Sequence, residues 1–256
     1  MSDEPIEVRV RVTGSAPVTF LTEDIVGGRF EPPRPPAHYV LDGMRLSDVD
    51  FSGLRLESMT AQGCTFERCD FTRARFHRSS LSFRSQSTYT DCLFDRTDLR
   101  VASPGSARFV RCTFDHAKLD GWRMWGTEFI GCRFVGPLRH MEFSARPGSV
   151  SAAQPRERNE IRDNDFRGID MEDVEFRGGV DLDAQLWPDD PSYVRLDIRP
   201  GTLDRLAPFV PHLSPEDERR ADLGWVRGRF AGQPEILIRD RTWQWYRNLL
   251  RLAAHN

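Results

Sequence analysis

Cysteine and histidine are the residues of this sequence with the most versatile chemistry, because thiols and imidazoles ligate metals, attack electrophiles and transfer protons. The chain of 256 residues contains five cysteines and six histidines. No two cysteines form a C-x-x-C pair, the spacing typical of zinc and redox sites. The histidines are scattered, and the sequence has no H-E-x-x-H, G-x-S-x-G, P-loop or dinucleotide-binding glycine pattern. We therefore expect a non-enzyme with no catalytic residue, no metal and no cofactor.

One acidic segment has part of the spacing of a calcium loop. Asp163, Asp165 and Gly168 fit that spacing, but Arg167 and Val174 occupy positions at which the loop needs oxygen ligands. Outward carboxylates elsewhere in the chain rarely have the shifted pKa values that catalysis needs. The acidic residues therefore predict surface charge and not a metal site.

The elements that carry these residues are indicated by a repeat, in which a large apolar residue returns every five positions between Leu41 and Phe143. The spacing slips by three residues after Leu81, and it returns at residues 161–176 after an interruption. A helix buries residues at a period near 3.6 and a strand at a period of 2, so neither explains a period of five. A fixed repeat over about 100 residues predicts a solenoid, in which each unit covers the apolar face of the next.

A smaller side chain stands two residues before most of the large ones, and all five cysteines occupy this small position. One large and one small inward residue per unit suit a narrow tube, because close packing leaves no room for two large ones. Placing the units on four sides predicts a phenylalanine column of Phe51, Phe71, Phe94, Phe114 and Phe134, and beside it a cysteine column of Cys69, Cys92, Cys112 and Cys132. We expect both columns to form the structural core.

This pattern resembles the pentapeptide-repeat family, and the resemblance covers residues 41–143 and about 161–182. It implies a mainly β fold, a right-handed quadrilateral β-helix (a solenoid) of about six coils. Some bacterial members of the family present rods with the width and negative charge of duplex DNA to type II topoisomerases, which they protect from quinolones or toxins. In some members a C-terminal helix joins two chains into a homodimer.

Three segments with different patterns divide the chain. We expect residues 1–38 to form an N-terminal β cap with a proline-rich connector, and residues 39–183 to form the repeat rod. The stretch 144–160 has no repeat and is rich in Ser, Ala, Pro and Arg, so it is expected to be a loop expelled from the rod. Residues 184–256 are expected to form a mostly helical C-terminal segment.

The C-terminal segment predicts a strand at residues 193–198 and a helix that begins at Ser214, with a capping serine followed by proline and acidic residues. That helix is expected to run to about Phe230. A final helix is expected from about Pro234 to Ala254, and it is too apolar to stand alone in water. Its Trp243, Trp245, Tyr246 and Leu250 are predicted to dock either on the rod or on a second copy of the chain.

Two tryptophans interrupt the pattern in the middle of the rod, because Trp122 occupies a small position and Trp125 follows Met124. An indole is too large for the tube interior beside a methionine, so we predict a backbone bulge between Gly121 and Gly126 and at least one indole outside. The residues around this side carry almost no charge. An uncharged side with exposed aromatic residues predicts a docking surface, either for the chain's own C-terminal segment or for a separate protein.

Charge is unevenly distributed along the rod. Residues 157–183 contain ten acidic residues against four arginines, a net charge of −6, whereas residues 41–143 contain thirteen acidic residues against fifteen Lys or Arg, a net charge of +2. We assign to partner binding, as the acidic end, Asp163, Asp165, Asp170, Glu172, Asp173 and Glu175. A DNA mimic needs a long acidic surface, since DNA-binding enzymes are built to meet regular phosphate charge.

Two hypotheses for the function follow. The protein is either a DNA-mimic modulator of DNA gyrase or another type II topoisomerase, giving resistance to a drug or toxin, or a general scaffold that docks a different protein partner. The formal net charge of −3, the absence of a long apolar run and a start without signal-peptide character predict a cytoplasmic protein with no membrane partner. Direct nucleic-acid binding is not expected, because the arginines are interleaved with acidic residues.

Overall fold

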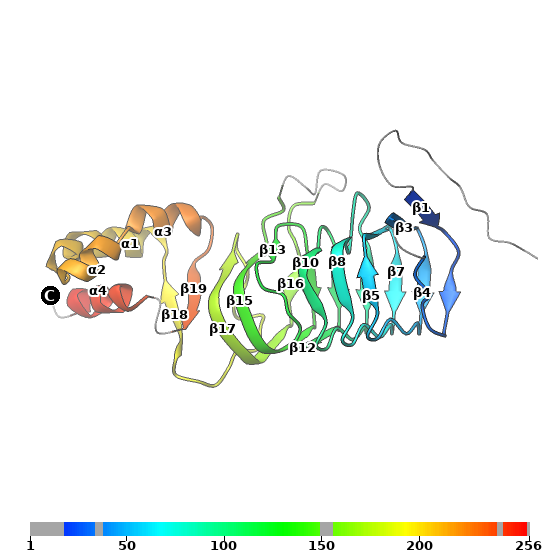
Figure 1. Ribbon diagram of the computed structural model, residues 1–256. Coiled ribbons are helices and arrows are strands. Elements are labelled where there is room, and N and C mark those ends of the chain that lie inside the picture. The colour runs from blue at the N-terminus through cyan, green and yellow to red at the C-terminus, as the bar shows by residue number, and fades with distance from the viewer. Residues whose placement is uncertain (1–17, 34–37, 149–155, 240–242, 255–256) are drawn as a thin grey trace, which may run out of the picture.

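The computed structural model describes residues 18–33, 38–148, 156–239 and 243–254. It shows an elongated molecule in which a rod of short strands is followed by a helical unit (Figure 1). The rod consists of β1 (Val18–Leu21), β2 (Ile25–Val26), β3 (His38–Asp42), β4 (Arg45–Ser47), β5 (Arg55–Glu57), β6 (Met59–Gln62), β7 (Thr65–Glu67), β8 (Arg75–Ser80), β9 (Thr88–Thr90), β10 (Asp98–Ser103), β11 (Arg108–Val110), β12 (Thr113–Asp115), β13 (Arg123–Met124), β14 (Glu128–Ile130), β15 (Arg133–Ser144), β16 (Ile161–Arg162) and β17 (Asp165–Arg177).

Strands of the rod pair in parallel with strands of the next coil. The longest ladder runs in the order β2-β4-β7-β9-β11-β14-β16. Its register places Phe66 opposite both Leu46 and Tyr89, so the three-residue slip after Leu81 is absorbed between the strands without shifting the inward residues. The predicted fold class is confirmed, because the chain forms a β-solenoid of about six turns with C-terminal helices.

The phenylalanine column is confirmed and is longer than predicted. Successive rings of Phe51, Phe71, Phe94, Phe114 and Phe134 are stacked with centroids 4.5, 4.8, 5.1 and 4.9 Å apart. Phe30 continues the stack at one end, and Phe166 and Trp187 continue it at the other. One line of aromatic rings therefore extends through the rod.

The cysteine column is also buried, and all five thiols are free. Each thiol points at a backbone carbonyl of the preceding coil, as in the contact of 3.3 Å from Cys112 Sγ to the oxygen of Tyr89. The Thr97 hydroxyl makes the same contact with the oxygen of Phe71, at 2.6 Å. Burial raises the pKa of the Cys112 thiol. The small position therefore holds a short donor that binds the coil before it.

The expectation that an indole is too large for the tube interior beside a methionine is wrong for Trp122. Its side chain is buried, and its Nε1 donates to the oxygen of Leu99 at 2.9 Å, as the smaller donors of this position do. Met124 keeps its inward position opposite Phe143. The indole fits because its one polar atom finds a carbonyl partner inside the rod. Trp125 is the indole that lies outside, as predicted for at least one of the pair.

The parallel ladder begins within the segment that was expected to be a separate cap. β1 pairs with β3, β2 pairs with β4, and Arg29 bridges to Asp50. Residues 18–30 therefore form the first rung of the rod, while the strand expected before them lies outside the described residues. At the other interruption, β15 continues to Ser144, so the 144–160 stretch leaves the ladder only after that residue.

The helical unit contains β18 (Tyr193–Asp197), α1 (Pro200–Leu206), the 3-10 helix η2 (Ala207–His212), α2 (Pro215–Arg220), α3 (Leu223–Arg229), β19 (Glu235–Arg239) and α4 (Gln244–Ala254). The predicted strand and the start at Ser214 are confirmed, since the Ser214 side chain accepts from the backbone N–H of Asp217. The helix expected from there to Phe230 is broken between α2 and α3. Among the described residues no helix is long and apolar enough to cross a membrane.

The prediction of one helix from about Pro234 to Ala254 is wrong for its first third. Residues Glu235–Arg239 instead form β19, which pairs antiparallel with β18. Leu237 packs into the core of the rod, whereas Ile236 and Ile238 pack into the core of the helical unit. An apolar run covered on both faces is typical of a buried strand, and periodicity alone does not distinguish it from a buried helix.

The helical unit packs on the last coil of the rod. The buried Gln233 accepts from the N–H of Gly179 and donates to the oxygen of Val180, at 2.9 and 2.8 Å. The Tyr193 hydroxyl donates to the oxygen of Ile169 at 3.0 Å. These contacts close the end of the solenoid, which otherwise exposes unpaired backbone groups.

Candidate binding surfaces

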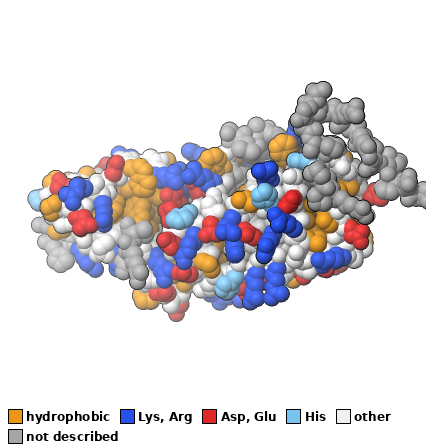
Figure 2. Space-filling view, viewed as in Figure 1, with side chains coloured by type: hydrophobic (Ala, Val, Ile, Leu, Met, Phe, Trp, Pro, Cys, Tyr) orange, Lys and Arg blue, Asp and Glu red, His pale blue; other side chains and the backbone are white. Residues whose placement is uncertain are grey.

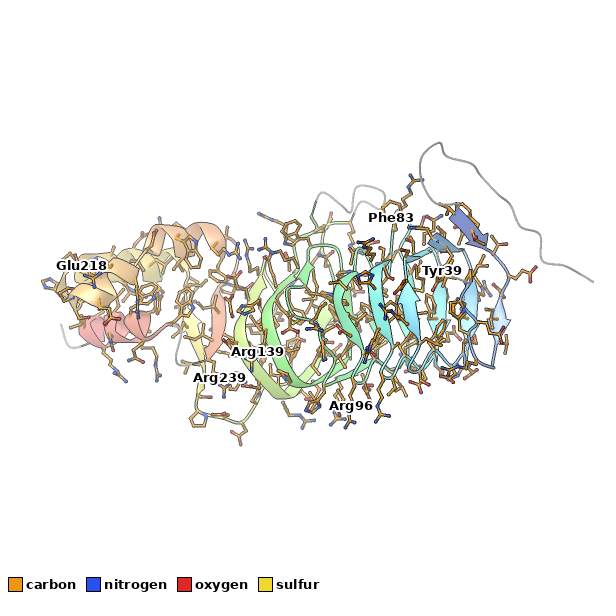
Figure 3. All side chains as sticks on the ribbon, viewed as in Figure 1. Tyr39, Phe83, Arg96, Arg139, Glu218 and Arg239 are labelled. Atoms are coloured by element: carbon orange, nitrogen blue, oxygen red, sulfur yellow. The ribbon has the colours of Figure 1, made fainter. Side chains whose placement is uncertain are left out.

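The six residues of the predicted acidic end all have cationic partners. The pairs are Asp163 with Arg162 at 2.6 Å, Asp165 with Arg167 at 2.9 Å, Asp170 with Arg139 at 3.1 Å and also with Arg239, Glu172 with Arg139, Asp173 with His140 at 3.0 Å, and Glu175 with Arg229 at 2.8 Å. Figure 3 labels Arg139 and Arg239 where the last coils meet the helical unit. The predicted acidic surface is therefore largely neutralised.

The pairing also shifts pKa values at this end. The hydrogen bond from Arg167 holds the pKa of Asp165 below its usual range. The hydrogen bond to Asp173 raises the pKa of the exposed His140 above its usual range, which favours the charged form of the imidazole. The ion pairs of Asp170 and Glu175 could not be seen in the sequence, because Arg139 comes from a neighbouring coil and Arg229 and Arg239 come from the helical unit.

Trp125 is held in a defined orientation on the outside of the rod. Its side chain is 42% exposed, and its Nε1 donates to Glu142 Oε1 at 3.0 Å. Glu142 in turn forms an ion pair of 2.8 Å with Arg177. Because the carboxylate is nearly buried and paired, it fixes the edge of the indole while part of the ring stays exposed.

A cavity of about 340 Å³ lies beside this indole, at the junction of the rod and the helical unit. Trp125, Arg146 and Pro147 line it from the rod, and Arg229 and Ala231 line it from the helical unit. The C-terminal segment therefore borders the Trp125 surface and does not cover it. Docking of a separate protein on this surface stays a prediction.

The four C-terminal docking residues do not meet this surface. Trp245 and Tyr246 are buried in the core of the helical unit, and Trp243 and Leu250 pack against that core. The Tyr246 hydroxyl donates to the oxygen of Asp197 at 2.6 Å. These residues hold the helical unit together, and a homodimer through the final helix stays a prediction.

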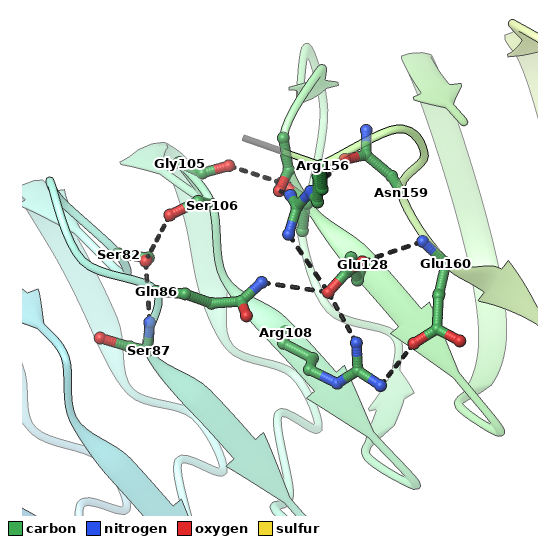
Figure 4. Close-up of polar contacts among 12 residues, drawn as sticks. Ser82, Gln86, Ser87, Gly105, Ser106, Arg108, Glu128, Arg156, Asn159 and Glu160 are labelled. Atoms are coloured by element: carbon green, nitrogen blue, oxygen red, sulfur yellow. Dashed lines mark hydrogen bonds and ion pairs between the residues drawn. The ribbon is translucent and has the colours of Figure 1, made fainter. Parts of the chain in front are cut away.

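A buried carboxylate that sequence analysis missed organises the side next to Trp125 (Figure 4). The nearly buried Glu128 accepts from Arg108 at 2.8 Å, from Gln86 Nε2 at 3.0 Å and from the N–H of Glu160 at 3.0 Å, and it pairs with Arg156 at 3.3 Å. Burial lowers the pKa of the Arg156 guanidinium. The pairing of Arg108 with Glu128 could have been predicted from the sequence. Each stands directly before an inward aromatic residue of the same column, so the two lie opposite each other on neighbouring coils.

Hydrogen bonds to Trp125 hold both ends of the 144–160 stretch in place. The carbonyl oxygen of Trp125 accepts from the N–H of Gly148 at 2.6 Å and from Asn159 Nδ2 at 3.1 Å. A Cβ at position 148 would lie 2.8 Å from Cβ of Trp125, so only glycine fits there. The ends of this stretch are thus built into the Trp125 surface, whereas residues 149–155 lie outside the described part of the chain.

The geometry defines a class of protein, a β-solenoid made of five-residue units with a surface of ion-paired side chains. The family model for pentapeptide repeats matches residues 45–82 with eight copies. The chain therefore contains pentapeptide repeats, and the same five-residue unit continues through the strands on both sides of that match. Within the described residues, no group of three His, Cys, Asp or Glu side chains is placed to hold a metal ion.

No curated protein matches the sequence. Among solved structures, the chain is similar to full-length QnrB1, a plasmid-mediated fluoroquinolone resistance protein, with 18% identity, a TM-score of 0.32, and coverage of 66% of this chain and 81% of that one. It is also similar to HetL from the cyanobacterium Nostoc sp., a pentapeptide repeat protein involved in heterocyst differentiation regulation, with 14% identity, a TM-score of 0.24, and coverage of 66% and 87%. At these values the similarity gives no information on a partner.

Proposed function

We propose that this protein is a non-enzymatic binding rod that docks a protein partner at the side around Trp125. The observation that carries the proposal is the placement of exposed aromatic residues. Of the large aromatic side chains that the described rod exposes, Phe83 (50%) and Trp125 (42%) both lie on the side whose other outward residues are mainly serine and glycine. Exposed aromatic side chains are typical anchors of protein interfaces.

The orientation of Trp125 supports the same proposal. A side chain that is already fixed loses less conformational freedom on binding than a mobile one, and this raises affinity. The hydrogen bond to Glu142 supplies that fixation, and the neighbouring cavity offers space for a side chain of the partner.

The test is a quantitative capture experiment in the native host, followed by affinity measurement with the purified partner. Replacing Trp125 with Ala is expected to cost about 2 kcal/mol or more of binding free energy, as aromatic anchors do. Trp225→Ala is the matched control, since Trp225 is also exposed but belongs to the helical unit. Equal affinity of the wild type and Trp125→Ala, with Phe83→Ala also unchanged, would exclude this surface.

The narrower form of the proposal names the partner as DNA gyrase or another type II topoisomerase, with the rod acting as a DNA mimic that confers resistance to a drug or toxin. What supports it is the excess of acidic residues at 157–183. The ion pairs of Asp163, Asp170 and Glu175 weaken it, because a carboxylate with a cationic partner presents less charge than a phosphate.

A supercoiling assay separates the two forms. The topoisomerase form requires that rising concentrations of the protein inhibit gyrase or reverse its poisoning by a quinolone. An unchanged assay removes gyrase as the partner and leaves the docking proposal to the capture experiment.

A further inference from the structure

Cations without an ion-pair partner among the described residues gather on one side of the rod and its corner. We call this region the basic side, and it consists of residues 53–58, 73–78, 96–101 and 116–121, which stack on successive coils. It contains seven Lys or Arg and three acidic residues, a net charge of +4 in a chain whose formal net charge is −3. Figure 2 shows blue side chains gathered along the lower edge of the rod, where Figure 3 labels Arg96.

Two of the three carboxylates of the basic side are already paired within it. Glu57 binds Arg55 at 2.6 Å and Asp98 binds Arg100 at 2.8 Å. The remaining cations are exposed and have no carboxylate within ion-pair distance in the part of the chain that the structure describes, and they are Arg73, Arg75, Arg78, Arg96 and Lys118. Basic and acidic residues therefore alternate along the sequence without neutralising each other in the folded rod.

The corner arginines form a line along the rod. Arg73 and Arg96 occupy equivalent positions on consecutive coils, because the N–H of Arg73 donates to the oxygen of Asp95, the residue before Arg96. Their φ angles of 60° and 56° place both at the corner turn. With a rise of about 4.8 Å per coil, the unpaired cations of the basic side follow one another along the axis on three consecutive coils, at residues 73–78, 96 and 118.

At the preceding corner of the rod, arginines pair with carboxylates of the neighbouring coil, so the fold can neutralise cations at a corner. There Arg68 binds Asp48 and Arg111 binds Asp91, each through two hydrogen bonds of 2.7–2.8 Å. These residues have the same place in their repeat units as Arg73 and Arg96, and their charges alternate from coil to coil. The basic side lacks that alternation, so its guanidinium groups keep their donors for a ligand.

We propose that the basic side binds the phosphodiester backbone of a nucleic acid, without reading its sequence. A row of exposed cations along the rod axis fits a linear polyanion, and arginine binds phosphate oxygens through two parallel hydrogen bonds. The array contains no exposed aromatic side chain on which bases could stack, so phosphates and not bases are the groups recognised. This inference is independent of the Trp125 surface.

The test is fluorescence anisotropy of the full chain with a labelled DNA duplex of about 20 base pairs and with a single strand of the same length, at about 50 and about 200 mM salt. The variant is Arg73→Gln with Arg96→Gln. Its control is Arg68→Gln with Arg111→Gln, which removes the same charge from equivalent turn positions. Because each lost phosphate contact lowers the slope of log affinity against log salt by about 0.9, the first pair is expected to lower it by about 2 and the control by much less.

Three results overturn the proposal. The first is no binding of either oligonucleotide at low salt, and the second is equal loss of affinity in the variant and its control. The third is tighter binding of poly-glutamate than of the duplex at matched charge, which would assign the basic side to an acidic protein. Retained binding after Arg73→Lys with Arg96→Lys, together with an unchanged circular dichroism spectrum, supports a direct role of the two charges.

Discussion

The rings of Phe71 and Phe94 are stacked with their centroids 4.8 Å apart and their planes 8° from parallel, although the three-residue slip separates them in the sequence. The slip is therefore accommodated outside the core. Each ring of this column rests on two others, so the rod behaves as one continuous core in which neighbouring coils depend on each other.

Phe94→Ala is expected to destabilise the protein by about 3–5 kcal/mol, because it removes a fully buried ring and leaves a cavity between two stacked neighbours. Urea unfolding followed by circular dichroism measures this. Phe83→Ala, at a half-exposed ring, is the control and should change stability by less than about 0.5 kcal/mol. Similar midpoints for the two variants would contradict the core role of the column.

Trp122→Phe tests the indole inside the tube. The substitution keeps an aromatic ring but leaves the carbonyl of Leu99 without its donor, so a loss of about 1–3 kcal/mol is expected. Trp125→Phe also removes an indole N–H, but its acceptor Glu142 keeps its ion pair with Arg177, so a smaller loss is expected. If Trp122→Phe proved as mild as Trp125→Phe in thermal unfolding, the hydrogen bond to Leu99 would have no energetic role.

Glu128→Ala should destabilise the protein by about 3–5 kcal/mol, because it leaves the part-buried Arg108 and Arg156 without their shared carboxylate. Glu57→Ala breaks an exposed pair with Arg55 and should cost less than about 1 kcal/mol. The difference between the two free energies of unfolding is the measurement. A difference near zero would show that the network is not maintained in solution.

Stability is expected to fall in acid through Asp197. Hydrogen bonds from Arg199 hold the pKa of this carboxyl well below its usual range in the folded state. The contribution is therefore present above the ordinary aspartate pKa of about 3.9 and is lost as pH falls from there towards the folded value. Melting temperatures of wild type and Asp197→Asn, measured from neutral pH downwards, should converge in acid, and parallel curves would contradict this assignment.

The five thiols should not react with a thiol reagent in the native protein. All are buried, so a reagent has no access to them, and burial raises the pKa of Cys64 and Cys112, which also disfavours the reactive thiolate at these two positions. Full reaction is expected only after unfolding in denaturant. Rapid labelling of a native thiol, located by mass spectrometry, would show that the column opens locally.

Several structural features could not be predicted from the sequence because they depend on partners from other coils. An indole was expected to be too large for the tube interior, because the size of Trp122 is visible in the sequence and its carbonyl partner is not. Residues 235–239 were assigned to a helix because a short apolar run gives no sign of being covered on both faces. The acidic end was assigned to a partner because net charge per segment does not show which arginines lie across from it.

The sequence by itself determined the rod and its phenylalanine and cysteine columns. A period of five is a local property of the chain, and once each unit turns a corner the stacking of inward residues follows from close packing. Only the tertiary structure decided which charges are neutralised and which remain free. Asp170 meets Arg139 and Arg239, while Arg73 and Arg96 meet no carboxylate among the described residues. Electrostatic partnership depends on distances across coils and between units, and these distances are set by the folded backbone and not by the order of residues.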